Sequence, residues 1–137
     1  MSGKVFLDTN ILLYAQDAGS PEKQRRSRDV IAQLATSGDG VISTQVLQEF
    51  YAAATRKLGV PPLAAKANLK TFTVFEIVQV SPALIHDAVD CSVLNALSFW
   101  DALILAAAAN SGCSTLYTED LNHGQIVLGV KVENPLR

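Results

Sequence analysis

The sequence predicts a single α/β domain, a three-layer sandwich in which a short, mainly parallel central sheet is flanked by helices. Short apolar runs alternate along the chain with longer helical segments, which is typical of βαβ units. These runs also lack the alternation of polar and apolar residues that is typical of a sheet with one solvent-exposed face. Strands buried on both faces are therefore favoured. With 137 residues the chain has the size of one domain, covering residues 1–137.

The first third of the chain predicts two strands separated by helices. KVFLD at 4–8 is apolar and β-rich, and a short helix over 11–16 follows until AGSP breaks it. A proline in its first turn favours a helix over 21–36. The sequence GDG then interrupts the chain, and VIS at 41–43 predicts the second strand.

The middle of the chain predicts three helices and a third strand. A helix over 44–59 ends at a glycine, and another begins in PPLAAKANLKTFTVF at 61–75. EIVQV at 76–80 predicts a strand. SPALIHDAVDCSVLNAL at 81–97 predicts a helix with a serine cap and a proline at its first position.

The last third predicts a buried helix and the remaining strands. The helix over 98–112 contains ALILAAAA, which is apolar on every side and therefore has to be buried all round. STLYT at 114–118 predicts a strand, and QIVLGVKVEN at 125–134 predicts one or two more. In such sheets ligands bind outside the carboxyl ends of the strands, so residues just after a strand are the first functional candidates.

Composition excludes several classes of protein. The formal charge of −2 argues against a protein that coats nucleic acid. Cys91 and Cys113 are far apart without a CxxC spacing, so neither a disulfide framework nor a zinc site is expected. No run approaches the roughly 18 apolar residues of a membrane span, and too few residues precede Asp8 for a signal peptide. We therefore expect a cytoplasmic protein without membrane association.

Two acids follow predicted strands. Asp8 ends the first strand, and Asp120 lies two residues beyond the strand at 114–118. Both stand where an open parallel sheet presents its binding site. Asp8 could equally be a cap for the helix that follows, and the residues alone leave these alternatives open.

Two further acids lie on predicted helices. Glu49 stands at the margin of an apolar stripe rather than opposite it, although an acid in an early turn is also favoured by the helix dipole. Asp101 fronts the apolar helix, where ionisation is costly unless a partner is present. Ser98 and Asp101 also fit the S-x-x-D capping box, so capping remains an alternative.

The sequence neighbours of these four acids include no lysine or arginine. If the acids converge in the fold, their mutual repulsion would raise pKa values, and a divalent cation such as Mg²⁺ or Mn²⁺ is the simplest remedy. The chemistry that fits is metal-assisted hydrolysis of a phosphodiester. Asn10 could orient a carboxylate or the attacking water, and Thr118 could bond a carboxylate ligand.

Four blocks of the sequence resemble the PIN-domain ribonucleases, and among them the VapC-type toxins of bacterial toxin–antitoxin pairs. The blocks are FLDTNILLY, QVLQEFY, FWDALILAAA and LYTEDLNHGQ followed by NP, and they occur in the order of the family. The resemblance covers essentially the whole chain. It implies a Mg²⁺- or Mn²⁺-dependent endoribonuclease that cuts RNA, a cognate antitoxin that plugs the site, and a homodimer.

The resemblance also implies roles for individual residues. Its catalytic acids correspond to Asp8, Glu49, Asp101 and Asp120, with Asp8 and Asp101 assigned as metal ligands. Its supporting polar residues correspond to Asn10 and Thr118. Glu119, next to Asp120, leaves open which of the two faces the metal, and Asp120 is the better match.

Other features have simpler interpretations. The basic segment EKQRRSRD at 22–29 could bind phosphates, but a solvated helix surface is favoured. Arg56 and Lys57 near a helix end fit the helix dipole. Trp100 could stack on a base, but a role in the core or in a dimer interface is favoured.

Two other functions remain to be weighed. One is a catalytically inactive module of the same fold that only binds protein, although the intact acid set counts against it. The other is a haloacid-dehalogenase-type phosphatase. That enzyme would require a second acid at Asn10, so its mechanism lacks a general acid here.

Overall fold

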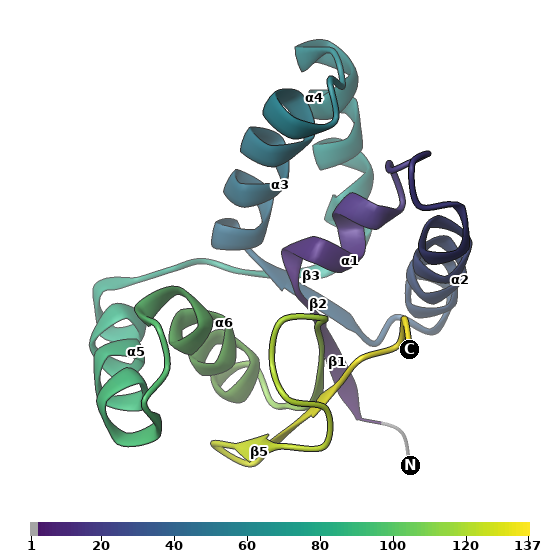
Figure 1. Cartoon of the computed structure of the whole chain (residues 1–137). Coiled ribbons are helices and arrows are strands. Elements are labelled where there is room, and N and C mark those ends of the chain that lie inside the picture. Colours follow the sequence, from purple (N-terminus) through teal and green to yellow (C-terminus); the bar gives the residue numbers. More distant parts are fainter. Residues whose placement is uncertain (1–2) are drawn as a thin grey trace.

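The computed structural model describes residues 3–137 and confirms the α/β class. Its sheet has six strands in the order β3-β2-β1-β4-β6-β5, with β1 and β4 at the centre (Figure 1). All neighbouring strands run parallel except the β5–β6 pair, which is antiparallel. The strands are β1 (Lys4–Leu7), β2 (Gly40–Ser43), β3 (Glu76–Val78), β4 (Cys113–Tyr117), β5 (Ile126–Val127) and β6 (Val130–Glu133).

Helices cover both faces of this sheet. The chain steps from β1 to β2 to β3 in one direction through α1–α4, and then returns to β4 through α5 and α6. Because parallel crossovers are right-handed, the reversed step places α5 and α6 on the face opposite α1–α4, as Figure 1 shows. The helices are α1 (Thr9–Tyr14), α2 (Pro21–Ser37), α3 (Thr44–Lys57), α4 (Pro62–Thr71), the 3₁₀ turn η1 (Phe72–Val74), α5 (Pro82–Asn95) and α6 (Phe99–Asn110).

Three of these helices begin at a serine cap. The hydroxyl oxygens of Ser43, Ser81 and Ser98 accept hydrogen bonds from backbone N–H groups at 3.3, 3.2 and 3.1 Å. Each bond satisfies one of the N–H groups that a helix N-terminus leaves without an intrahelical partner. The caps predicted at Ser81 and Ser98 are therefore confirmed.

A large part of the core lies between the central strands and α6. Seven consecutive residues of α6, from Ala102 to Ala108, are buried, which confirms the prediction of a helix buried on every side. Phe6, Leu7 and Leu116 of the central strands are fully buried as well. This packing fixes the ends of β1 and β4 in space, and with them the residues that follow.

Several predicted boundaries differ from the observed ones by a few residues, and three of these differences are informative. Helix α1 begins at Thr9 rather than at residue 11, because Asp8 is its N-terminal flanking residue. Helix α4 gives way to the 3₁₀ turn after Thr71, in a TFTV segment whose β-branched residues disfavour a continued α-helix. Strand β3 stops at Val78, and the Val80 N–H donates to the Thr44 hydroxyl at 3.1 Å instead of continuing the sheet.

The structure also bears on the expectations about the cysteines and about membrane-spanning segments. Cys91 and Cys113 are free cysteines, as expected, and the structure shows that both are buried. Within residues 3–137 no single helix is long and apolar enough to span a membrane. The pair α5 and α6 reaches that length and composition only together, with a bend of 115° between the two helices.

Candidate active site

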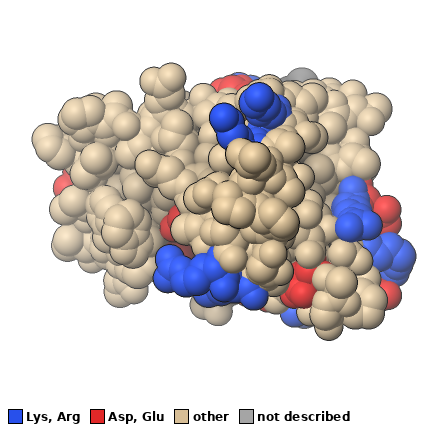
Figure 2. Space-filling model, turned by 90° about the horizontal axis from the view of Figure 1, so that it is seen from above, with Lys and Arg blue, Asp and Glu red and all other residues tan. Residues whose placement is uncertain are grey.

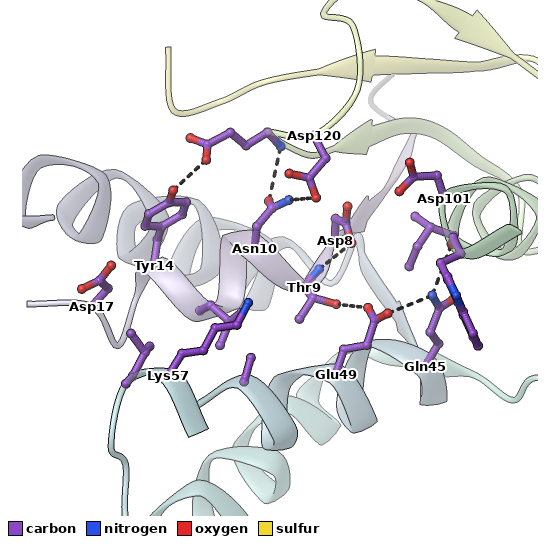
Figure 3. A pocket seen from close by; sticks show the side chains of 16 residues that line it. Asp8, Thr9, Asn10, Tyr14, Asp17, Gln45, Glu49, Lys57, Asp101 and Asp120 are labelled. Atoms are coloured by element: carbon purple, nitrogen blue, oxygen red, sulfur yellow. Dashed lines mark hydrogen bonds between the residues drawn. The ribbon is translucent and has the colours of Figure 1, made fainter. Parts of the chain in front are cut away.

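The candidate site lies where the sheet reverses its winding. The chain leaves β1 toward one edge of the sheet and leaves β4 toward the other, so a crevice opens beyond their carboxyl ends. A cavity of about 460 Å³ occupies this position. It is lined by residues of α1, α3, α6 and the segment after β4 (Figure 3). All four predicted acids line it, namely Asp8, Glu49, Asp101 and Asp120.

Asp8 is the most buried of these acids, with 6% of its surface exposed. Its Oδ1 accepts a hydrogen bond from the Thr9 N–H at 2.7 Å, and its Oδ2 accepts one from the Thr118 hydroxyl at 2.7 Å. The pKa of Asp8 is raised to about 6, mainly by burial, which outweighs these two bonds, and to a smaller extent by the charges of Asp120 and Glu49. The capping interpretation is therefore incomplete, because the second oxygen bonds across the sheet to the end of β4.

Asn10 and Thr118 connect Asp8 to Asp120. The Asn10 amide donates to Asp120 Oδ2 at 3.0 Å and to Thr118 Oγ1 at 3.3 Å. The Asp120 N–H also donates to Thr118 Oγ1, at 3.1 Å, and the Asn10 amide oxygen accepts from the Glu119 N–H at 3.3 Å. Both residues predicted to support the acids therefore contact them directly.

Glu49 is held by two residues that the sequence interpretation missed. Its Oε1 accepts from the Thr9 hydroxyl at 2.8 Å and its Oε2 accepts from the Gln45 amide at 3.3 Å. The same amide nitrogen donates to the Trp100 carbonyl at 3.2 Å, which ties α3 to the start of α6. Gln45 lies four residues before Glu49 on one helix face, and that spacing was the available signal.

Asp101 takes part in only half of the predicted capping box. Its N–H donates to the Ser98 hydroxyl, while among residues 3–137 no hydrogen bond from the Ser98 N–H to the Asp101 carboxylate is found. The carboxylate is half-buried and points toward the side of the cavity where Asp8 and Asp120 lie (Figure 3). Its position is therefore set by the helix, and its oxygens stay available to a ligand.

Glu119 also lines the cavity but has partners of its own. Tyr14 donates its hydroxyl to Oε1 at 2.6 Å, and Lys23 forms an ion pair with Oε2 at 2.6 Å. Burial alone would raise the pKa of Glu119, but the hydrogen bonds from Lys23 and Tyr14 hold it below its ordinary value. The Glu119 carboxylate is thus used to fasten the segment after β4 to α1 and α2.

The two remaining candidates, Trp100 and the basic segment at 22–29, have different outcomes. Trp100 is 62% exposed and lines the cavity wall, so the core role is wrong, while the dimer-interface role stays a prediction. In the segment at 22–29, Arg25 and Arg26 bond to Glu22. At the right-hand edge of Figure 2, where Figure 1 places α2, blue and red atoms lie together, which favours the solvated-surface interpretation.

The donor set of the cavity fits a hard divalent cation. Its acids offer carboxylate oxygens, and the raised pKa of Asp8 reflects negative charge and burial that a cation would relieve. Within residues 3–137 no three acidic, histidine or cysteine side chains converge closely enough to form a complete protein cage. Mg²⁺ accepts such a site because it keeps several waters and uses one or two carboxylates.

Fold and site together define a small doubly wound α/β domain with an acidic pocket at its switch point. The sequence matches the PIN domain family over residues 5–127, so the chain belongs to this family. The family resemblance drawn from the sequence blocks is thereby confirmed. A search of curated proteins found no significant match.

Solved structures that are similar to the chain include VapC toxins and toxin–antitoxin complexes. The structure of Mycobacterium tuberculosis VapC20, a sarcin–ricin loop cleaving toxin, has a TM-score of 0.68 at 24% identity, covering 85% of this chain and 90% of that chain. The structure of DNA-bound VapBC from Salmonella typhimurium has a TM-score of 0.71 at 19% identity, covering 97% of this chain and 98% of that chain. A toxin–antitoxin complex from Klebsiella pneumoniae has a TM-score of 0.67 at 22% identity, covering 93% of this chain and 95% of that chain. At these identities the likeness shows the fold.

Proposed function

We propose that this PIN domain is a Mg²⁺- or Mn²⁺-dependent endoribonuclease and the toxin of a toxin–antitoxin pair. The observation that carries the proposal is the meeting of Asp8, Glu49, Asp101 and Asp120 in one cavity, although they come from distant parts of the chain. The structural likeness to a sarcin–ricin loop cleaving toxin and to VapBC complexes supports RNA as the substrate and an antitoxin as the partner.

The residues of the chain have distinct roles in this proposal. Asp8 and Asp101 are the metal ligands, and Glu49 and Asp120 complete the acidic site from opposite walls of the cavity (Figure 3). A bound Mg²⁺ or Mn²⁺ would activate a water and shield the charge on the scissile phosphate and its leaving oxygen.

The supporting residues hold these carboxylates in place. Asn10 and Thr118 fix Asp8 and Asp120 through their hydrogen bonds, so these two acids need little reorganisation when substrate arrives.

The proposal also predicts the chemical nature of the cut ends. Water attacks the phosphorus in line with the leaving 3′ oxygen, which leaves a 5′-phosphate on one fragment and a 3′-hydroxyl on the other. An attack by the 2′-hydroxyl would instead give a 2′,3′-cyclic phosphate. Finding cyclic ends, or full activity in EDTA, would contradict the proposal.

The family resemblance also suggests how the protein is assembled. We propose a cytoplasmic protein without membrane association, a homodimer, and an antitoxin that occupies the acidic cavity and so blocks cleavage. The complexes of similar fold support the antitoxin.

The most informative test expresses the chain with and without Asp8→Asn and maps new RNA ends in the cell. Growth arrest with discrete cuts that disappear in the variant is the expected outcome, and the cut sites would name the target. If both chains leave RNA intact and neither binds Mn²⁺, the inactive protein-binding module becomes the better interpretation.

A further inference from the structure

The cavity is charged very unevenly along its length. Among residues 3–137, six acids line it and only one basic side chain does, Lys57, the last residue of α3. An RNA strand is a polyanion, so a cavity of this composition repels it except where a cation is present. The acids are Asp8, Asp17, Glu49, Asp101, Glu119 and Asp120.

Lys57 is free to take a ligand. Its side chain is exposed and extends into the cavity toward α1 (Figure 3). Among residues 3–137 no acid lies within ion-pair distance of its ammonium group, even though the cavity is rich in carboxylates. Lys23 and Arg25, by contrast, are each engaged by an acid at 2.6 and 2.7 Å.

Lys57 and Trp100 lie at opposite ends of α3, although Trp100 itself belongs to α6. Trp100 is bonded through its carbonyl to Gln45 in the first turn of α3, whereas Lys57 closes the last turn. Glu49 stands between these two positions on the same helix, and it lines the cavity with them. A strand that lies along α3 therefore passes the acids between an exposed aromatic ring and a free ammonium group.

We propose that Lys57 binds a non-bridging oxygen of an RNA backbone phosphate next to the one that is cleaved. This inference rests on the proposed ribonuclease function and adds a phosphate subsite on the Lys57 side of the acids. The subsite fixes the strand along α3 and offsets part of the repulsion from the carboxylates.

The alternative explanation of Lys57 is the dipole of α3, which favours cations in the last turn. Arg56 provides the matched control, because it stands in the same last turn and is exposed but does not line the cavity. A dipole effect is shared by both residues. A phosphate contact belongs to Lys57 alone.

The test compares the wild type, Lys57→Gln, Lys57→Arg and Arg56→Gln on a short fluorescent RNA that contains the mapped cut site. We expect Lys57→Gln to lower kcat/KM about tenfold at low salt, mainly through KM. The slope of log(kcat/KM) against log[NaCl] should become less steep by about 0.7, the contribution of one phosphate contact in a single strand. Lys57→Arg should restore the slope, and Arg56→Gln should leave it unchanged.

Two further measurements separate this inference from its alternatives. Mn²⁺ binding, followed by electron paramagnetic resonance without RNA, should be as tight in Lys57→Gln as in the wild type. Equal losses in Lys57→Gln and Arg56→Gln, or a wild-type salt slope in Lys57→Gln, would overturn the subsite. Normal cleavage combined with weaker antitoxin binding would assign Lys57 to the protein partner and also overturn it. A wild-type chain that cuts no RNA would end the proposed function itself, independently of any variant.

Discussion

The two walls of the cavity are built in different ways. The strand-end group, Asp8, Asn10, Thr118 and Asp120, follows the central strands and is joined by hydrogen bonds of 2.7–3.3 Å. The helix group, Gln45, Glu49 and Asp101, is carried by α3 and α6. In this group Glu49 has two side-chain partners, and Asp101 is bonded through its N–H to its helix cap.

The two groups therefore differ in how firmly their side chains are held before a ligand binds. The strand-end group is fixed by the sheet and by its own network, so Asp8 and Asp120 are placed before any ligand arrives. The helix group depends on how α3 and α6 pack, with Gln45 as the bond between them. We therefore expect changes in the strand-end network to affect both folding and cleavage, and changes in the helix group to affect mainly cleavage.

The largest expected effect comes from the two proposed metal ligands. Asp8→Asn and Asp101→Asn should each lower cleavage about a thousandfold, because each removes an anionic ligand worth several kcal/mol in the transition state. Single-turnover cleavage of a target RNA measures this, with Asp17→Asn as the control at the other end of the cavity. If Asp101→Asn cleaved RNA normally, Asp101 would not be a metal ligand, and the helix group would have only a structural role.

The second effect concerns the pH dependence of stability. Burial raises the pKa of Asp8 to about 6 from its ordinary value of 3.8, so the folded chain binds more protons than the unfolded chain between these values. The free energy of unfolding should therefore fall as the pH rises from about 4 to 6, by up to about 3 kcal/mol. Urea denaturation in EDTA at a series of pH values measures the slope.

A variant and a metal sharpen this pH prediction. Asp8→Asn should remove the slope, whereas Asp17→Asn should keep it. Added Mn²⁺ should stabilise the folded protein more at pH 7 than at pH 4.5, because the ligand carboxylates have to be ionised. A slope that persists in Asp8→Asn would trace the effect to another group.

The sequence predicted the strand-end group better than the helix group, for a physical reason. A residue that follows a parallel strand has its place set by the sheet, so Asp8 and Asp120 could be located from strand positions alone. Asn10 and Thr118 lie within two residues of these acids, and their polar groups could be assigned as partners. The acids of α3 and α6 could be proposed from helix faces, but not the contacts between the two helices.

The misses have the same origin. Lys57 lines the cavity because α3 packs beside α1. The spacing of residues within α3 does not predict this tertiary packing. A role in the core or in a dimer interface was favoured for Trp100, and the structure excludes the core. The sheet-facing volume is instead filled by the residues from Ala102 onward, and the indole remains outside at 62% exposure.

The third effect tests the network of the strand-end group. Thr118→Val removes the hydroxyl that donates to Asp8 and accepts from Asn10, at a position that is fully buried. We expect a loss of about 1–3 kcal/mol in unfolding free energy and a 10- to 100-fold loss of cleavage. The loss of the Thr118 bond should also raise the pKa of Asp8 further, which shifts the pH profile of cleavage upward. Thr118→Ser should restore all three values.

The fourth effect tests the bond between the helices. Gln45→Met keeps the approximate size of the side chain but removes the amide that donates to Glu49 and to the Trp100 carbonyl. Cleavage should fall about tenfold because Glu49 is less well positioned. Stability should change little, because the buried Gln45 Oε1, which has no partner among residues 3–137, is removed as well. The control is Gln48→Met, an exposed position on the same helix.

The smallest effect is expected on α2, away from both walls of the cavity. Arg25 pairs with Glu22 and Asp29 at 2.7 and 3.7 Å, and its side chain is 61% exposed. Such surface ion pairs contribute little to the free energy of unfolding, since water and salt screen them and two long side chains have to be ordered. Arg25→Gln should therefore shift Tm by less than about 2 °C and leave the salt slope of cleavage unchanged. A slope reduced as strongly as in Lys57→Gln would instead place an RNA contact on α2, because only a residue that meets a phosphate releases its counterion.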